Sequence, residues 1–85
     1  LLEPIMALSV ECQTKHLGTI LPDLHSNRRA FVHNFEGTEE SAGSIQMIEA
    51  EAPLAELVGY APWLRTVTSG TATLALEFKG YKPTN

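Results

Sequence analysis

The chain has a single cysteine, few basic residues and no long apolar run. Cys12 is the one cysteine among its 85 residues, so no disulfide can form within the chain. Six lysines and arginines against ten acidic residues leave a net charge of −4. This charge argues against binding nucleic acid by bulk electrostatics, because that mode neutralises several phosphates at once. The apolar stretches are broken by Glu, Gly or Pro, so we expect a protein that is not secreted and does not enter a membrane.

The residue patterns of catalytic and cofactor sites are also missing. No glycine is followed by Lys-Ser or Lys-Thr, so the chain has no phosphate-binding loop and is not a GTPase by itself. His16, His25 and His33 fall on different predicted elements, which does not favour a metal site. Cys12 has no neighbouring base in the sequence, which favours an inert buried thiol over a nucleophile. We therefore expect no catalytic, cofactor or metal-binding residue here.

The glutamates could instead form a cation site or a pair of catalytic carboxylates. Most of them lie in or beside a polar stretch of sequence, so a solvated surface is the better interpretation. The residues concerned are Glu36, Glu39, Glu40, Glu49 and Glu51.

Alternation of apolar and polar residues predicts strands, most clearly in the last third of the chain. Aromatic and β-branched residues favour a further strand in the middle. The polar stretch 36–44, with two glycines, is expected to be a loop between paired strands. The expected strands are 5–13, 30–35, 45–51 and 71–81.

Apolar residues three and four positions apart between Leu17 and Leu24 predict an amphipathic helix. Thr14 is the expected N-cap, and Arg28 lies near the end of the helix. Pro22 removes one backbone hydrogen bond, at a cost of about 3 kcal/mol or more inside a regular helix. The helix is therefore expected either to kink at Pro22 or to start late.

The segment 53–70, PLAELVGYAPWLRTVTSG, is predicted to form two short helices. Pro53 suits the start of the first helix, and Gly59 interrupts the apolar spacing. Pro62 disfavours the α region for the residue before it, so the second helix is expected to begin at about Pro62. Gly70 is placed to close that helix in a left-handed conformation. The residues expected to set this structural hinge are Gly59, Tyr60, Pro62 and Gly70.

The expected order of elements is βαββαβ within one domain, residues 1–85. Two crossover units joined by a hairpin fit an α+β, ferredoxin-like split βαβ sandwich. In this fold a four-stranded antiparallel sheet carries both helices on one face. Right-handed crossovers predict the strand order 4-1-3-2.

Three arginines are candidates for docking contacts. Arg28 and Arg29 are expected to close the first helix. Their positive charges there are explained equally well by attraction to the negative end of the helix dipole and by a docking role. Arg65 is expected on the second helical segment, either as a ligand for phosphate or carboxylate or as a surface arginine without a partner. Trp63 beside it is favoured as a core or partly buried residue.

Two other interpretations of this part of the chain are not favoured. The stretch 28–35, RRAFVHNF, partly echoes the RNA-recognition motif, but its aromatics fall on the second strand and not on the third. We treat it as an accident of composition. A small enzyme of acylphosphatase type would need a phosphate cradle with a paired Arg and Asn, and Asn27 beside Arg28 is the one local candidate.

Four separated stretches resemble a single family. Together they are similar to the C-terminal domain, usually called domain V, of elongation factor G and its relatives among the ribosomal translocases. The likeness covers the whole chain. The stretches are LLEPIM at 1–6, Asp23-Leu24 followed by Arg28-Arg29, the segment 53–70, and LALEFKGY at 74–81.

The resemblance implies the same ferredoxin-like fold and a fragment of a larger translational GTPase, an expectation that also fits a chain beginning without Met. GTP and Mg²⁺ would bind an upstream domain of that parent. This chain would be a ribosome-docking domain for translocation or recycling. It would lie near the GTPase-associated region of the large subunit, beside ribosomal RNA, a ribosomal protein and other domains of the parent. Arg28, Arg29 and Arg65 are then the expected contacts. The alternative is a free-standing ferredoxin-like module that binds RNA or a small ligand.

Within the family, LRTVTSGTATLALE at 64–77 is more similar to the second mitochondrial elongation factor G. That branch acts with ribosome recycling factor to split ribosomes, so the expected location is the mitochondrial matrix or the cytoplasm. The chain departs from the common pattern at Ala30, where a glycine usually follows the double arginine. The segment between Leu24 and Arg28 is also one residue longer than usual.

Overall fold

A computed structural model describes residues 1–37 and 45–84. Of the loop predicted over 36–44, residues 36 and 37 belong to a strand, and 38–44 lie outside the described residues. Two short 3₁₀ helices, η1 and η2, precede the two α-helices. The elements are β1 Leu2–Gln13, η1 Thr14–His16, α1 Leu17–Ser26, β2 Phe31–Gly37, β3 Ile45–Pro53, η2 Leu54–Leu57, α2 Tyr60–Val67 and β4 Thr73–Pro83.

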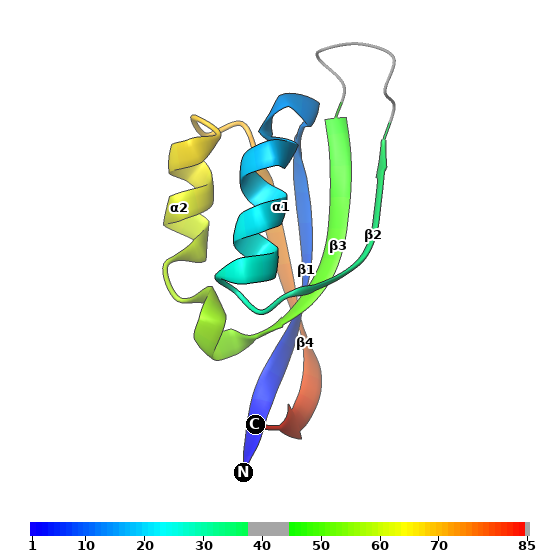
Figure 1. The fold of residues 1–85 in the computed structure, drawn as a ribbon, viewed down its shortest axis with the longest axis vertical. Coiled ribbons are helices and arrows are strands. Elements are labelled where there is room, and N and C mark those ends of the chain that lie inside the picture. Colours follow the sequence, from blue (N-terminus) through cyan, green and yellow to red (C-terminus); the bar gives the residue numbers. More distant parts are fainter. Residues whose placement is uncertain (38–44, 85) are drawn as a thin grey trace.

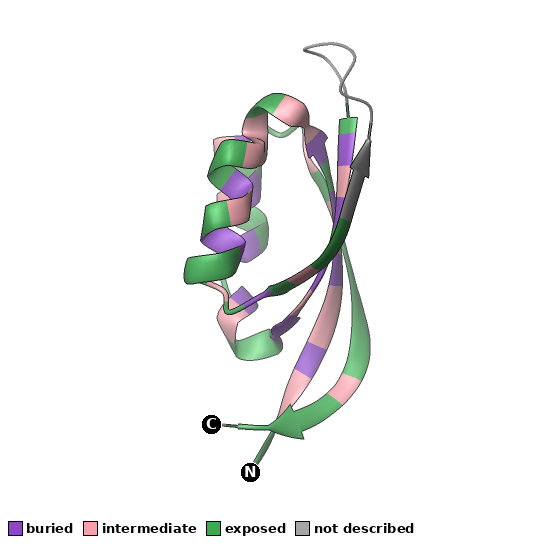
Figure 2. Cartoon of the chain, turned by 45° about the vertical axis from the view of Figure 1, so that its right-hand side comes forward, coloured by how far each residue is buried: buried purple, intermediate pink, exposed green. Residues whose placement is uncertain are grey.

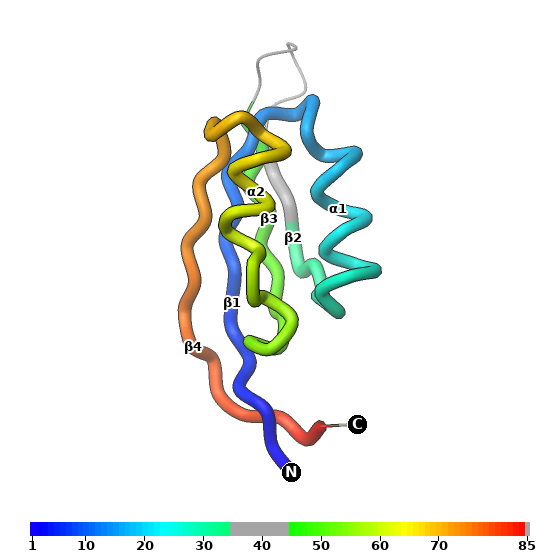
Figure 3. Tube along the Cα trace, turned by 90° about the vertical axis from the view of Figure 1, so that its left-hand side faces the viewer, coloured from blue at the N-terminus to red at the C-terminus, as the bar shows by residue number. Residues whose placement is uncertain are grey.

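The four strands form one antiparallel sheet in the order β2-β3-β1-β4. Both α-helices lie on the same face of the sheet, and its other face is open (Figures 1 and 2). Viewed onto the helices, α1 lies toward β2 and α2 toward β4 (Figure 3). The predicted ferredoxin-like fold and strand order are confirmed.

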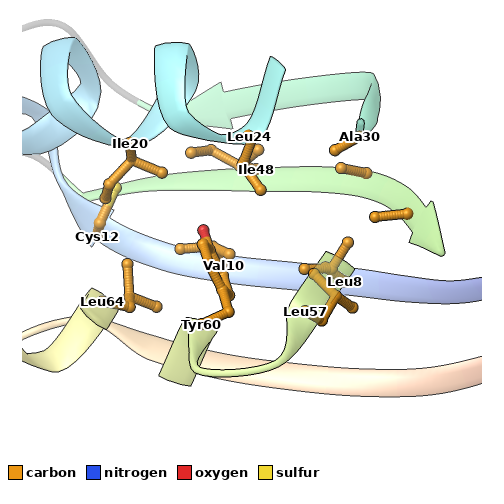
Figure 4. Packing of buried hydrophobic residues seen from close by; sticks show 12 residues of the cluster. Leu8, Val10, Cys12, Ile20, Leu24, Ala30, Ile48, Leu57, Tyr60 and Leu64 are labelled. Atoms are coloured by element: carbon orange, nitrogen blue, oxygen red, sulfur yellow. The ribbon is translucent and has the colours of Figure 1, made fainter. Parts of the chain in front are cut away.

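The core fills the space between the helices and β1 and β3 (Figure 4). Full burial of a large apolar side chain contributes roughly 1.5 to 3 kcal/mol, so these residues supply most of the driving force for folding. Cys12 is 1% exposed, as predicted for an inert thiol, and burial raises the pKa of its thiol. The core residues are Leu8, Val10, Cys12, Ile20, Leu24, Ala30, Ile48, Ala50, Ala52, Leu57, Tyr60 and Leu64.

The start of α1 differs from the sequence prediction. Thr14 does not cap the helix, because it begins the separate 3₁₀ turn η1. His16 occupies the capping position before Leu17, and no side chain caps the helix there. The apolar stripe itself is confirmed, since Ile20 and Leu24 are fully buried.

Neither of the two prolines in the helices leaves a buried backbone group without a hydrogen-bond partner. α2 begins at Tyr60, two residues earlier than predicted, so Pro62 falls in the first turn. N–H groups of the first turn have no partner within a helix, and Pro62 therefore costs no hydrogen bond. Pro22 lies inside α1, which runs past it to Ser26. Gly18, whose carbonyl loses a partner, is exposed, so water can solvate that oxygen.

The end of α2 is closed by two consecutive residues with positive φ, Ser69 at 54° and Gly70 at 80°. The N–H of Gly70 donates to the carbonyl of Arg65 at 2.8 Å, and that of Ser69 to Thr66 at 3.4 Å. This is the Schellman arrangement. The left-handed conformation predicted for Gly70 is confirmed, and Ser69 shares it.

β4 is the outer strand beside β1, and its apolar face is only partly covered. Leu76 lies opposite Leu8 and Phe78 opposite Met6, so both side chains are on the same face of the sheet as the helices. Nevertheless Leu76 is 45% and Phe78 is 53% exposed. α2 has eight residues, about 12 Å at 1.5 Å per residue, and is too short to cover the strand.

Candidate docking surface

Arg28 follows α1 and is largely turned into the protein, with its side chain 15% exposed. Its Nε donates to the Asp23 carboxylate at 3.2 Å, and its Nη1 donates to the carbonyls of Glu56 at 3.0 Å and Val58 at 3.1 Å. Asn27 donates to the same carboxylate at 2.6 Å. This geometry gives Arg28 an internal role, because it fastens the end of α1 to the connection that precedes α2.

Arg29 is the adjacent arginine, and it points toward solvent, with its side chain 47% exposed. It pairs with Glu3 of β1 at 3.1 Å and with Glu56 of η2 at 3.2 Å. Its φ of 50° is left-handed, a conformation that costs a non-glycine residue about 1 to 2 kcal/mol. The sequence predicted helix-end charges at 28 and 29 but gave no sign of these partners, which come from distant parts of the chain.

Arg65 differs from the other two predicted contact residues because it is exposed and has no ion-pair partner among the described residues. It lies on α2, is exposed, and makes no side-chain hydrogen bond or ion pair with any residue that the structure describes. It borders a hollow of about 320 Å³ between α2 and the start of β4, which we name the α2–β4 groove. The groove is lined by Ala61, Leu64, Arg65, Ala72, Thr73 and Leu74.

The predicted hinge residues surround the start and end of α2. Gly59 has a φ of 78° and separates η2 from α2. Tyr60, the first residue of α2, is 1% exposed and stacks on Trp63, with ring centroids 5.8 Å apart. Its hydroxyl has no hydrogen-bond partner among the described residues. Burial raises the pKa of Tyr60, and the nearby Asp23 raises it further while Arg28 opposes the shift.

An ionic cluster on the open face was not foreseen from the sequence. Glu51 of β3 pairs with His33 of β2 at 3.1 Å and with Lys82 of β4 at 3.5 Å. Burial alone would raise the pKa of Glu51, but the hydrogen bonds and charges of His33 and Lys82 outweigh it and hold that pKa below its ordinary value. Glu51 is therefore an ion-paired acid of the open face. The strand pairing brings the three residues together, and no local pattern indicates it.

The remaining sequence candidates stay apart. His16, His25 and His33 lie in η1, α1 and β2. Across residues 1–37 and 45–84, no three His, Cys, Asp or Glu side chains are grouped so that they could hold a metal ion. No helix in that part of the chain is long and apolar enough to cross a membrane. Glu39 and Glu40 lie outside the described residues.

Comparisons with known proteins agree with the resemblance found in the sequence. The family described as Elongation factor G C-terminus matches residues 1–85. A relative from Danio rerio, "Ribosome-releasing factor 2, mitochondrial", is 42% identical over 84 residues, which cover 99% of this chain and 10% of that protein. A crystal structure from Thermus thermophilus is similar with a TM-score of 0.79 and 35% identity, over 94% of this chain and 11% of that one.

These matches confirm the family predicted from the separated stretches, and the Danio rerio relative confirms the likeness to the mitochondrial ribosome-releasing branch. The chain spans 10% of the length of that relative. The chain belongs to the elongation factor G C-terminus family.

Proposed function

We propose that this chain is the ribosome-docking C-terminal domain of a longer translational GTPase that acts in translocation or ribosome recycling. The observation that supports this most is the family match over all 85 residues. The 42% identity to a protein named for releasing ribosomes favours recycling over translocation. The same name favours the mitochondrial matrix as the location.

In this proposal the chain contributes binding and not chemistry. The described residues do not fit GTP or Mg²⁺, because they contain no metal-ligating group of three and the sequence has no phosphate-binding loop. In this proposal GTP and Mg²⁺ bind an upstream domain of the parent.

The proposed partners are the RNA and a ribosomal protein near the GTPase-associated region of the large subunit. Other domains of the parent lie beside the chain, and ribosome recycling factor acts alongside it. A net charge of −4 restricts any RNA contact to local arginines. Arg65 is the best placed because its side chain is exposed and unpaired among the described residues, whereas Arg29 would have to share its charge with Glu3 and Glu56.

Arg28 takes part mainly by holding the surface in shape. It is anchored to Asp23 and to the backbone before α2, so it fixes where α2 and Arg65 lie. Gly59, Tyr60, Pro62 and Gly70 set the same helix at its two ends.

Co-sedimentation of the full-length parent with ribosomes at several salt concentrations tests the proposal. Arg65→Ala should weaken binding about threefold to fivefold, the size of an exposed charged contact, and should lower the salt dependence. Lys15→Ala is the matched control, because Lys15 is an exposed cation on η1 that does not line the α2–β4 groove. Equal binding by Arg65→Ala and the wild type would remove Arg65 from the contact. A parent that does not sediment with ribosomes at all would overturn the docking proposal.

A further inference from the structure

The outer edge of β4 is a free strand edge in the described structure. β4 ends the sheet order β2-β3-β1-β4, and no described residue pairs with its outer side. Strand edges of this kind present unpaired N–H and C=O groups that can accept another strand. Proteins usually protect such edges with bulges, lysines or prolines.

The protection of this edge begins only partway along it. From Thr73 to Phe78, β4 pairs with β1 in an unbroken register. The register shift falls after Phe78, and Lys79, Lys82 and Pro83 follow it. The first half of β4 is therefore regular and unprotected. The opposite edge differs, because the register of β2 shifts already between Val32 and Asn34.

The unprotected half of β4 also carries an apolar row. Leu74, Leu76 and Phe78 alternate along the face that the helices occupy, and α2 covers only the beginning of this row. Leu74 is half-buried and lines the α2–β4 groove, while Leu76 and Phe78 are exposed. A strand added to β4 would place every second side chain beside this row.

A positive charge stands at one end of the row. Arg65 borders the α2–β4 groove next to Ala72 and Thr73, and the described residues offer it no anion. Glu77, the nearest acid along β4, alternates to the opposite face from Leu76. Arg28, Arg29 and Lys82, in contrast, are all ion-paired. The carboxylate of Glu11 is also near this end of the strand, where it accepts a hydrogen bond from the Thr73 hydroxyl at 3.5 Å. Glu11 lies opposite Thr73, and so on the other face of the sheet from Leu74. Arg65 therefore has no ion-pair partner among the described residues.

We propose that residues 73–78 of β4, with the α2–β4 groove, form an acceptor site for an extended polypeptide strand. The bound strand has alternating apolar side chains and a carboxylate opposite Arg65. A polypeptide fits this surface better than RNA, because a strand edge is matched by main-chain groups and one arginine cannot neutralise several phosphates. This inference goes beyond ribosome docking and does not depend on it.

A synthetic peptide tests the site directly. The probe is acetyl-Val-Thr-Val-Thr-Asp-Thr-amide, whose valines and aspartate lie on one face of the strand. Antiparallel pairing with residues 73–78 places the valines beside Phe78 and Leu76 and the aspartate beside Leu74 and Arg65. Binding to the 85-residue chain is followed by calorimetry and by backbone amide shifts in NMR. Shifts should concentrate at 73–78 and at Arg65. Arg65→Ala, and an Asp-to-Asn peptide, should each weaken binding about threefold to fivefold, while Lys15→Ala should leave it unchanged.

Two N-methylated versions of the peptide distinguish strand addition, which needs main-chain hydrogen bonds, from binding through apolar side chains alone. A strand donates hydrogen bonds to one neighbour only from alternate residues, so methylation of one alternating set should abolish binding and methylation of the other should leave it intact. Equal binding of both methylated peptides would overturn the proposal. So would shifts on the open face, or self-association of the chain through β4 with no response to peptide. Because no ribosome is present, failure here leaves the ribosome-docking proposal standing.

Discussion

The guanidinium of Arg28 lies over the ring of Tyr60, 5.1 Å from the ring centroid. Tyr60 is the first residue of α2, and Arg28 lies just after the end of α1. The same guanidinium is hydrogen-bonded to Asp23 and to two backbone carbonyls before α2. One side chain therefore joins α1 to the start of α2, and its removal should destabilise the packing of both helices.

Arg28→Ala should destabilise the chain by about 2 to 4 kcal/mol, because it leaves the Asp23 carboxylate, 8% exposed, without its charged partner. Urea unfolding followed by circular dichroism measures this. Lys15→Ala, which removes an exposed cation of η1, should change the free energy of unfolding by less than about 0.5 kcal/mol. Equal stability of Arg28→Ala and the wild type would contradict the internal role of Arg28.

Two substitutions of Arg29 should measure the free-energy cost of its left-handed backbone conformation. Arg29→Ala and Arg29→Gly both remove the ion pairs with Glu3 and Glu56, but only glycine adopts a φ of 50° without strain. The glycine variant should therefore be more stable than the alanine variant by about 1 kcal/mol, after allowance for the greater freedom of glycine in the unfolded chain. If alanine proves the more stable, Arg29 is not held in the left-handed region in solution.

Tyr60→Phe should leave stability unchanged or raise it by about 1 kcal/mol. The Tyr60 hydroxyl is buried and has no hydrogen-bond partner among the described residues, so its removal relieves an uncompensated desolvation cost. Thermal and urea unfolding measure the difference. A loss of more than about 1 kcal/mol would show that the hydroxyl is bonded in solution.

Alkaline pH should destabilise the wild type more than Tyr60→Phe. The pKa of Tyr60 is raised above its ordinary value, so the folded state retains a proton that the unfolded state loses. The contribution is complete below the unfolded pKa of about 10 and is lost progressively as pH rises above it. Urea midpoints between pH 8 and 11 should thus fall more steeply for the wild type. Parallel curves for the two proteins would mean that Tyr60 ionises like an exposed tyrosine.

Leu64→Ala should cost roughly 2 to 5 kcal/mol, because Leu64 is 2% exposed and packs α2 into the core (Figure 4). Leu54→Ala is a matched control on η2, where the same side chain is 44% exposed, and it should cost less than about 1 kcal/mol. An unchanged melting curve for Leu64→Ala would mean that α2 faces the sheet differently.

The fold was predictable because its determinants are local. Alternation marked most of the strands, and aromatic and β-branched residues marked the one at 30–35. The three-and-four spacing around Leu24 marked α1, and the crossover rule then predicted the strand order. The predictions from sequence were wrong where the exact position of a residue at the end of a helix decides its conformation. The rule that the α region is disfavoured before proline predicts a helix start at Pro62, but α2 begins at Tyr60 and places Pro62 in its first turn. Ser69 adopts a positive φ, which is uncommon for serine and which the sequence therefore does not predict.

The site was less predictable, because its pairs join residues far apart in sequence. The family resemblance and the surface position of Arg65 followed from sequence. The partners of Arg28 and Arg29 did not, since Glu3 and Glu56 approach them only after the sheet and η2 have formed. Glu51, His33 and Lys82 likewise meet through strand register alone. Whether Arg28, Arg29 and Arg65 contact a ribosome stays a prediction.

The central position of β1 has a consequence for the order in which the molecule folds. β1 is the first strand in the chain, yet its two neighbours, β3 and β4, both come much later. Closing such long loops carries an entropic cost before any pairing compensates it, and this slows folding relative to helical domains of equal size. During synthesis, β1 has both of its edges unpaired until β3 appears, and the sheet is complete only when the final strand has been made.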